Sequence, residues 1–340
     1  MKTLNAAIIG CGAIHICHVE ALRQTPGVAL RAVVDVDKEK GLALSAEYGC
    51  HFYQDYREML CDVTIDMVHI CTPHYLHKPM VLAALAAGKQ VFCEKPVGMN
   101  MADIVEMRAA EKQADGRLGV CYQNRLNPTS LALHQLLSEK ALGQLLSINA
   151  FLTWSRPPPY YVNSPWRGRY ASEGGSLLIN QAIHTLDLVQ WFGGGVTRLK
   201  GVVDCARLED TIDTEDTAMA TLEFSGGARG LFFASNNHTR DAPLQLDIHC
   251  EQGELQLRDN TLWRVSDGKR VVLASDETPY GHSKSYWGMG HLLAIRQFYE
   301  AVRSGSSEGI TGLHEAAKSL QLVEAIYRSS QLRHWVTLPR

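Results

Sequence analysis

The first 123 residues alternate short, uninterrupted apolar runs with helical patterns, and this alternation limits the possible folds more than any other feature. The runs lack a polar face, which is typical of strands buried on both sides in a parallel sheet covered by helices. We expect strands at Leu4–Ile9, Val28–Val34, Met67–Cys71, Val91–Cys93 and Leu118–Tyr122. We expect helices at Ile14–Arg23, Lys38–Glu47, Leu76–Ala87 and Met101–Ala114.

The pattern changes after Asn124, where consecutive strand-like segments follow one another. Residues 223–227, Glu-Phe-Ser-Gly-Gly, are typical of a hairpin turn. Pro157-Pro158-Pro159 indicates a stiff, exposed loop over a site. We expect strands at Leu145–Trp154, Thr197–Cys205, Thr217–Phe224, Ala228–Ser235 and Leu244–His249, and helices at Ser130–Ser138, Ser176–Trp191, His291–Arg303 and Leu313–Ser329. This half predicts an α+β domain with an open, largely antiparallel sheet and helices on one side.

Length and composition indicate a two-domain globular protein. A chain of 340 residues is too long for one ordinary core, and we expect domains at 1–123 and 124–340. The near-balance of 33 basic and 36 acidic residues disfavours a nucleic-acid partner. No apolar run approaches the roughly 18 residues of a membrane span, and the N-terminus enters a strand pattern without a leader. Nine scattered cysteines favour free thiols in a cytoplasmic protein.

A glycine turn follows the first predicted strand and opens the first predicted helix. In Gly10-Cys11-Gly12-Ala13-Ile14, the first glycine permits the tight turn and the second lets a pyrophosphate approach the helix N-terminus. His15 replaces the third glycine, which usually serves helix–sheet packing. Asp35 ends the second strand, where an acid can accept hydrogen bonds from ribose hydroxyls. The pattern predicts a dinucleotide site that favours NAD over NADP, with Lys38 and Lys40 close enough to weaken that preference.

Two polar clusters follow later strands of the predicted parallel sheet. One contains Thr72, Pro73, His74 and His77, and the other is the tripeptide Glu94-Lys95-Pro96. Ligands bind at the carboxyl edge of such sheets, so this lysine lies where a nicotinamide ring is expected. A surface Glu–Lys pair before a helix is the alternative interpretation.

These motifs, taken in order, resemble the glucose–fructose oxidoreductase, inositol dehydrogenase and MocA family along essentially the whole chain. The similar segments are Gly-Cys-Gly-Ala at 10–13, Thr-Pro-x-x-x-His at 72–77, Glu-Lys-Pro at 94–96, Tyr-Gln-Asn-Arg at 122–125, Trp-Arg-Gly at 166–168, Gly174–Asp187, and Tyr286–His291. The resemblance implies a Rossmann domain, a second domain whose exposed sheet face makes homodimers or homotetramers, and hydride transfer between NAD(P) and a sugar or polyol.

The resemblance also implies roles for individual residues. Lys95 corresponds to the catalytic lysine, which accepts an alcohol proton, and His184 to the catalytic histidine. Asn180 stands where many members have aspartate; an amide orients a hydroxyl but cannot take its proton. With the glycine turn and Asp35, the expected cofactor-binding residues are Gly10, Gly12, Ala13, Ile14, Asp35, Thr72, Pro73, His74, His77, Glu94, Lys95 and Gln123.

For several residues of the second half, the sequence allows either a functional or a structural role. Tyr161 and Arg167 follow the proline segment and either bind a sugar or build a structural loop. Asp187 either orients the His184 imidazole or caps a buried polar cluster. We expect substrate contacts from Asn180, Tyr161, Arg167 and Asp187. We expect no metal, because Cys11, His15, Cys17 and His18 surround one helix turn beside the phosphate site.

The predicted activity is oxidation of a secondary hydroxyl on a sugar, glycoside or cyclitol with NAD as cofactor. A glycosidase that uses transient oxidation on a held NAD, and a sugar- or nucleotide-sensing regulator without activity, are alternatives of different classes. Retention of both Lys95 and His184 disfavours the regulator, and net release of NADH separates the other two.

Overall fold

The computed structural model describes residues 3–276, 290–306 and 308–339, so Tyr286–Met289 of the resemblance lies outside the described residues. The chain divides into two compact units. Unit 1 is Met1–Gln123 with Pro279–Ala317, and unit 2 is Asn124–Thr278 with Lys318–Arg340. The division after Gln123 coincides with the expected one, whereas the segment that contains helix α10 (Gly290–Ser304) groups with unit 1 and not with the second domain as we expected.

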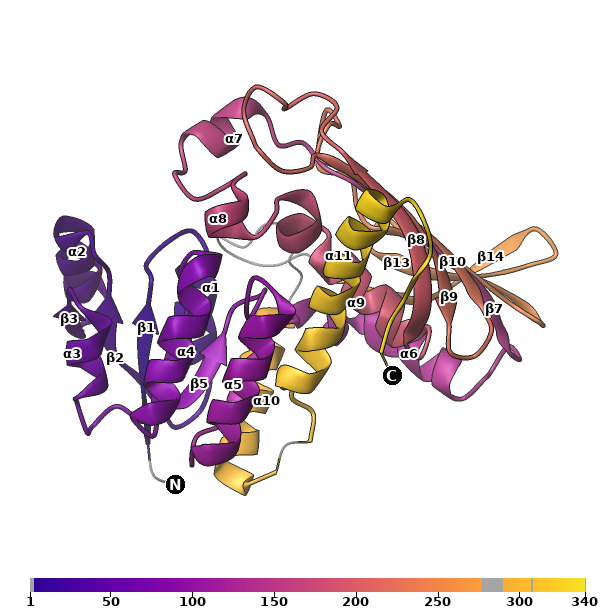
Figure 1. The fold of residues 1–340 in the computed structure, drawn as a ribbon. Coiled ribbons are helices and arrows are strands. Elements are labelled where there is room, and N and C mark those ends of the chain that lie inside the picture. Colours follow the sequence, from indigo (N-terminus) through magenta and orange to yellow (C-terminus); the bar gives the residue numbers. More distant parts are fainter. Residues whose placement is uncertain (1–2, 277–289, 307, 340) are drawn as a thin grey trace. The chain divides into compact units, whose positions relative to one another are not determined.

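Unit 1 is built on a six-stranded parallel sheet, which confirms the Rossmann-type architecture. Its strand order is β3-β2-β1-β4-β5-β6. Successive strands are therefore added on one side of β1 up to β3 and on its other side from β4 onward, so the order of addition reverses between β1 and β4. That reversal is the position at which ligands bind in open α/β sheets. The strands are β1 Leu4–Ile9, β2 Val28–Val34, β3 His51–Tyr53, β4 Met67–Ile70, β5 Gln90–Cys93 and β6 Leu118–Val120. The helices are α1 His15–Arg23, α2 Lys38–Tyr48, α3 Tyr56–Leu60, α4 His77–Ala86 and α5 Met101–Gln113, together with α10 (Figure 1).

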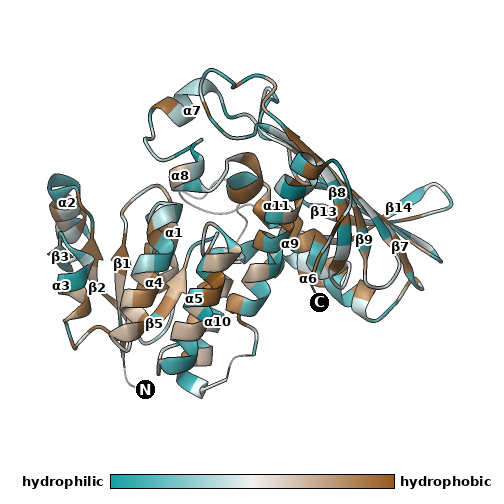
Figure 2. Ribbon diagram, viewed as in Figure 1, coloured by the Kyte–Doolittle hydropathy of each residue, from teal (hydrophilic) through white to brown (hydrophobic). Residues whose placement is uncertain are grey.

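The core of unit 1 lies between the sheet and helices from both ends of the chain. Ala6 and Ile8 of β1 pack with Leu22 of α1 and with Phe298 and Tyr299 of α10, all nearly inaccessible to solvent. In Figure 2 strands β1 and β5 are coloured as hydrophobic, whereas α2 and α3 are largely hydrophilic. The apolar runs that predicted strands are therefore the runs that fill this core.

Unit 2 contains a nine-stranded sheet in the order β14-β13-β12-β11-β7-β10-β9-β8-β15. Strands β7 and β10 pair in parallel and the other neighbours are antiparallel, as expected for a largely antiparallel sheet. The strands are β7 Leu145–Thr153, β8 Val196–Asp204, β9 Thr217–Phe224, β10 Arg229–Ser235, β11 Gln245–Cys250, β12 Gly253–Arg258, β13 Thr261–Ser266, β14 Lys269–Ser275 and β15 Val336–Thr337. The helices are α6 Pro128–Ser138, α7 Pro158–Val162, α8 Tyr170–Glu173, α9 Ile183–Phe192 and α11 Leu313–Leu332, whose first residues belong to unit 1.

Two segments of unit 2 differ from the sequence expectation. The proline segment is exposed, but Pro158 begins the short helix α7 instead of continuing a loop, because proline suits the first helical turn. The helix expected from Ser176 onward starts as a π-helical turn, Leu177–Gln181, in which the Ala182 N–H donates to the Leu177 carbonyl at 2.8 Å. No helix among the described residues is long and apolar enough to cross a membrane.

Candidate functional site

Gly10 and Gly12 in the loop after β1 have different surroundings. Gly10 has φ +91°, and a Cβ there would lie 2.8 Å from the Cys71 carbonyl oxygen at the end of β4. A Cβ on Gly12 would meet nothing within 4 Å, and Gly12 and Ala13 are exposed at the start of α1. The loop is therefore closed towards the sheet and open in front of the helix N-terminus. That open space fits the pyrophosphate of a dinucleotide.

Asp35 is tied to this glycine loop. Its Oδ2 accepts the Cys11 N–H at 2.8 Å and its Oδ1 accepts the Asp37 N–H at 3.0 Å. A carboxylate has about four acceptor positions, so it retains capacity for ribose hydroxyls. Lys40 Nζ lies 3.5 Å from Asp35 Oδ2. The acid and the nearby cation therefore both lie beside the glycine loop.

The residue in place of the third glycine, His15, holds the beginning of α1 through its ring nitrogens. Nδ1 lies 2.5 Å from the Gly12 carbonyl oxygen and Nε2 lies 3.0 Å from the Tyr48 hydroxyl. Helix packing at this position therefore depends on polar contacts with α2 instead of a close glycine approach.

His77 braces the two loops at the carboxyl ends of β4 and β5. Its Nε2 lies 2.8 Å from the Thr72 carbonyl oxygen and its Nδ1 lies 2.6 Å from that of Pro96. The ring is 1% exposed, and burial lowers its pKa although both contacts oppose the shift. His77 was expected to contact the cofactor; with both nitrogens occupied, it instead fixes the loops that carry Thr72 and the half-buried Lys95. His74 is buried as well.

Glu94 turns its side chain into the interior of unit 1. Its Oε1 lies 3.0 Å from His18 Nε2 and 3.7 Å from His291 Nε2. His18 Nδ1 lies 2.9 Å from His69 Nδ1, and His69 Nε2 lies 3.0 Å from the Tyr299 hydroxyl. Burial opposes ionisation of Glu94, yet its histidine contacts hold its pKa well below the usual range. The carboxylate that was expected at the cofactor is therefore held in the interior by its contacts with His18 and His291.

Two further interior residues lie close to Glu94. The ligand atoms of Glu94, Cys121 and His291 lie within 4.8 Å of one another, all buried, a spacing that could hold a metal ion. Gln123, also expected at the cofactor, is 2% exposed, and its Oε1 lies 3.8 Å from Cys121 Sγ. The sequence weighed Cys11, His15, Cys17 and His18 as ligands, and of these His18 contacts Glu94.

In unit 2, Asn180 and His184 stand out on a segment that is otherwise buried. Between Leu177 and Gln190 these two residues are half-buried and all others are buried. They lie on either side of the change from the π-helical turn to α9. Single π-turns occur frequently at functional sites because they redirect the side chains that follow. The sequence analysis expected functional roles for both residues, and these roles stay predictions.

Asp187 faces the interior and not a substrate. Its carboxylate accepts hydrogen bonds from Arg125 Nε and Nη2, both at 2.7 Å, and from Ser319 Oγ at 2.8 Å. The residue is 1% exposed. Of the two interpretations left open, the structure supports the buried polar cluster, and the expected substrate contact is wrong because the carboxylate is already satisfied by Arg125 and Ser319.

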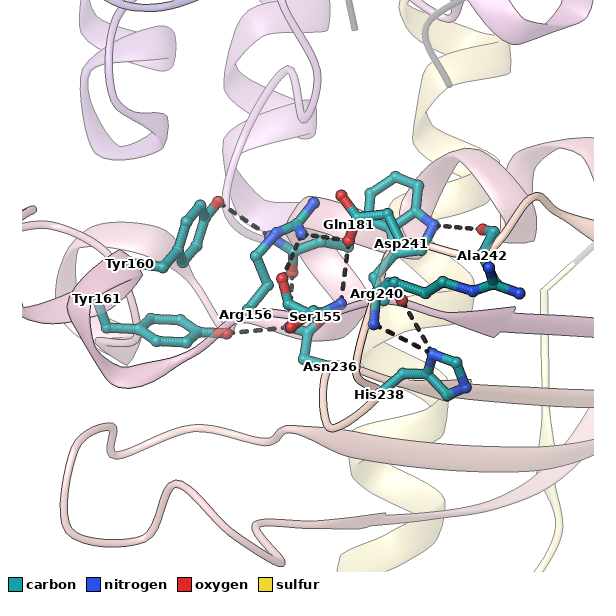
Figure 3. Close-up of polar contacts among 11 residues, drawn as sticks. Ser155, Arg156, Tyr160, Tyr161, Gln181, Asn236, His238, Arg240, Asp241 and Ala242 are labelled. Atoms are coloured by element: carbon teal, nitrogen blue, oxygen red, sulfur yellow. Dashed lines mark hydrogen bonds and ion pairs between the residues drawn. The ribbon is translucent and has the colours of Figure 1, made fainter. Parts of the chain in front are cut away.

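Tyr161 is likewise part of an interior network (Figure 3). Its hydroxyl accepts hydrogen bonds from Asn236 Nδ2 at 3.0 Å and Ser176 Oγ at 3.1 Å, and the residue is 3% exposed. Burial raises the pKa of this hydroxyl. The expected substrate contact of Tyr161 is therefore replaced by a structural one. The neighbouring Tyr160 is half-buried and accepts from Gln181 Nε2 at 3.2 Å.

The guanidinium of Arg167 lies over two aromatic rings. Its guanidinium carbon lies 4.2 Å from the Tyr160 ring centroid and 5.2 Å from that of Trp166. Stacking on two aromatic rings restricts the position of the guanidinium. Arg167 is half-buried, and its expected substrate contact stays a prediction.

Comparisons with known proteins identify the family of both halves of the chain. Residues 4–122 match the oxidoreductase family with a NAD-binding Rossmann fold, and residues 130–256 match the GFO/IDH/MocA C-terminal domain. Trans-1,2-dihydrobenzene-1,2-diol dehydrogenase of Sus scrofa is 31% identical over 90% of each chain. The chain belongs to the Gfo/Idh/MocA family. It is an oxidoreductase, and unit 1 contains its NAD-binding Rossmann fold.

Other Gfo/Idh/MocA relatives cover the full length of the chain. Levoglucosan dehydrogenase of Pseudarthrobacter phenanthrenivorans is 25% identical, over 100% of this chain and 99% of the relative. The solved WlbA dehydrogenase from Bordetella pertussis, in complex with NADH and UDP-GlcNAcA, is 26% identical with a TM-score of 0.88, and the match covers 100% of this chain and 99% of that one. These matches therefore extend over both units of the chain.

Proposed function

We propose that this protein is a NAD-dependent dehydrogenase that oxidises a secondary hydroxyl of a sugar, glycoside or cyclitol. The observation that carries the proposal is the half-buried pair Asn180 and His184 on a helix whose other residues are interior. Polar side chains held at the accessible edge of a buried helix are suited to orient a hydroxylated ligand. Relatives named for levoglucosan and myo-inositol support the substrate class.

Each half of the chain supplies part of the proposed chemistry. NAD, when bound by Gly12, Ala13 and Asp35, supplies a hydride acceptor. Lys95 accepts the proton of the alcohol, and His184 takes the second acid–base role. Asn180 and Arg167 orient the substrate through neutral and charge-assisted hydrogen bonds respectively.

We propose NAD rather than NADP as the working cofactor. The Asp35 carboxylate bonds the glycine loop and repels a 2′-phosphate, although Lys40 at 3.5 Å offsets part of its charge. The test is a screen of NAD and NADP reduction with sugars, inositols, glycosides and sugar nucleotides. Stoichiometric NADH release with NAD supports the proposal. Hydrolysis of glycosides without net NADH would identify a glycosidase, and binding without turnover of any compound would identify a regulator.

Lys95→Ala should lower turnover by about a hundredfold or more, because a positioned acid–base group contributes on that scale. The affinity for NAD should change much less, as measured by calorimetry. Lys78→Ala serves as the control, since Lys78 forms ion pairs with Asp103 and Glu106 at 2.9 and 3.1 Å on another part of unit 1. Near-normal turnover of Lys95→Ala would make Glu-Lys-Pro a structural motif here.

We further propose that the chain forms a homodimer or homotetramer through the open face of the nine-stranded sheet. Val202 and Met219 are register partners, and Leu231 lies on the same face of β10. Their side chains are 45, 46 and 42% exposed, whereas the alternating residues Ala218 and Ala220 are buried. Met219→Lys should lower the mass of the particle measured by light scattering, since a charge at the centre of an apolar interface is costly. An unchanged mass for Met219→Lys would place the interface elsewhere.

A further inference from the structure

A buried carboxylate, that of Glu173, lies directly behind Asn180. Glu173 is the last residue of α8, and the chain then reverses through Gly174, which has φ +81°. This turn brings Glu173 Oε1 within 2.5 Å of Asn180 Nδ2. Its other oxygen, Oε2, accepts the Gly168 N–H at 2.5 Å. Glu173 is 0% exposed, so protein groups such as these, and not bulk water, surround its carboxylate.

The partners of Glu173 determine how the Asn180 amide is oriented. The Gly168 N–H can only donate, so one carboxylate oxygen must accept there. An ionised carboxylate can only accept, so the amide must present its NH₂ group to the other oxygen. The carbonyl oxygen of Asn180 then lies on the opposite side of its amide plane. With Glu173 ionised, Asn180 offers an acceptor in that direction.

The charge on Glu173 depends on several neighbours. Burial raises its pKa to about 7, although the hydrogen bonds from Gly168 and Asn180 and the nearby Arg167 guanidinium oppose the shift. Glu215, a buried carboxylate that accepts the Leu178 N–H at 2.8 Å, adds to the shift. The Tyr161 and Tyr327 hydroxyls also face this region, and burial keeps both neutral.

We propose that Glu173 is a positioning residue for the reaction, which fixes the orientation of the Asn180 amide and thereby makes Asn180 a hydrogen-bond acceptor for a substrate hydroxyl. The inference rests on the proposed function, in which Asn180 orients the substrate. Position 180 lacks the aspartate of many family members, and the buried carboxylate of Glu173 lies behind the asparagine that replaces it. This carboxylate acts on the amide and does not itself exchange a proton with the substrate.

Protonation of Glu173 reverses the hydrogen bond to Asn180. A carboxylic acid whose carbonyl oxygen accepts from Gly168 donates its O–H to Asn180, which must then turn its carbonyl oxygen inward. Asn180 becomes a donor on its outer side, and a hydroxyl that needs an acceptor is held less well. The Michaelis constant for the sugar should therefore rise as the pH falls through about 7.

Glu173→Gln locks the reversed state at every pH. The glutamine oxygen must accept the Gly168 N–H, so its NH₂ group faces Asn180 and turns the amide over. We expect KM at pH 8.5 to increase about two- to tenfold, the range of one lost neutral hydrogen bond, with no further change down to pH 6. The wild type should approach the same KM at pH 6. A Glu173→Gln KM that equals the wild-type value and keeps its pH dependence would overturn the proposal.

A second measurement needs no substrate. The side-chain amide signals of Asn180 in ¹⁵N-labelled protein, assigned by their loss in Asn180→Asp, should shift with a midpoint near pH 7 in the wild type. They should stay constant in Glu173→Gln. Glu215→Gln is the matched control, because it removes a neighbouring buried carboxylate and should move the midpoint without abolishing it. An Asn180 signal that does not titrate in the wild type, or titrates equally in Glu173→Gln, overturns the proposal.

Asn180→Ala separates this inference from the function on which it rests. If Asn180→Ala raises KM while Glu173→Gln does not, Asn180 orients the substrate and Glu173 does not position it. If neither variant changes KM but the amide signals titrate as expected, the coupling is correct and the assignment of Asn180 to the substrate is wrong.

Discussion

Asp187 shows how strongly one residue can depend on its partners in this protein. Three hydrogen bonds from Arg125 and Ser319 replace the water that the carboxylate loses on burial. Desolvation of two charges offsets much of the attraction between them, so the pair itself adds little net stability. Removing one partner leaves the other charge buried without compensation, and that loss is large.

Asp187→Asn should therefore lower the free energy of unfolding of unit 2 by about 3–5 kcal/mol. Urea denaturation, followed by the tryptophan fluorescence of this unit, measures the change. Arg169→Gln is the control, because Arg169 and Asp213 lie 3.8 Å apart with both side chains 51% exposed. Its effect should stay within about 1 kcal/mol. Equal effects of the two substitutions would contradict a buried ion pair at Asp187.

At the scale of elements, the sequence predicted strands whose buried residues form an apolar run or a regular alternation. The bounds of β1, β2 and β9 agree with the predicted ones residue for residue, because apolar residues fill the buried positions of each strand. The sequence analysis expected neither β3, which has only three residues, nor β14, which contains the apolar run Val271–Ala274 but has no buried residue. The π-helical turn before α9 has no sequence signal of its own.

Candidate residues of the site could be named from the sequence where they belong to one local motif. Contacts between residues of distant segments could not be predicted in this way. Lys95 and His184 belong to local motifs that the sequence displays. The partners of Glu94 come from α1 and α10, so only the folded chain brings them together. For the same reason Asp187 and Tyr161 looked available, since nothing near them in the sequence shows which residues bury them.

The histidines that join the elements of unit 1 should make it sensitive to acid. Burial lowers the pKa of His18 and lowers that of His69 well below 6.5. Both rings therefore bind protons more readily in the unfolded chain. The contribution of the two neutral rings to the free energy of unfolding is complete above about pH 6.5. It is lost as the pH falls below that value, by at most about 1.4 kcal/mol per pH unit for each ring.

Replacing His69 should reduce this acid sensitivity. In His69→Gln the melting temperature of unit 1 should fall less steeply between pH 6.5 and 5 than in the wild type, as calorimetry would show. His249→Gln, at a side chain that is 45% exposed on β11, should leave the slope unchanged. A slope in His69→Gln as steep as that of the wild type would mean that other groups cause the acid sensitivity.

At the scale of the whole molecule, the units are interleaved along the chain. Unit 1 takes its last core residues, Ile295, Phe298 and Tyr299, from α10, after the strands β7 to β14 of unit 2. Phe298 lies so close to Gly119 of β6 that a Cβ on that glycine would be 2.6 Å from its ring. Helix α10 is therefore part of the NAD-binding core and not an addition to the second domain.

Phe298→Ala should destabilise unit 1 by about 3–5 kcal/mol, the cost of deleting a fully buried aromatic ring. Hydrogen exchange read by mass spectrometry should show faster exchange in β1, β4 and β6. The strands β9 to β11 of unit 2 should exchange as in the wild type. Faster exchange in β9 to β11 and none in β1 would contradict the assignment of α10 to unit 1.

The return of α10 to the first sheet has a consequence for how the chain is made. A ribosome adds roughly 5–20 residues per second, and domains that are continuous in sequence can fold as they emerge. Here the six strands of the NAD-binding unit emerge first, and their covering helix follows roughly ten to thirty seconds later. During that interval the apolar surface around Ala6, Ile8 and Met67 lacks the side chains that cover it in the finished protein. The unit that is synthesised first thus cannot be completed until most of the second unit has been synthesised.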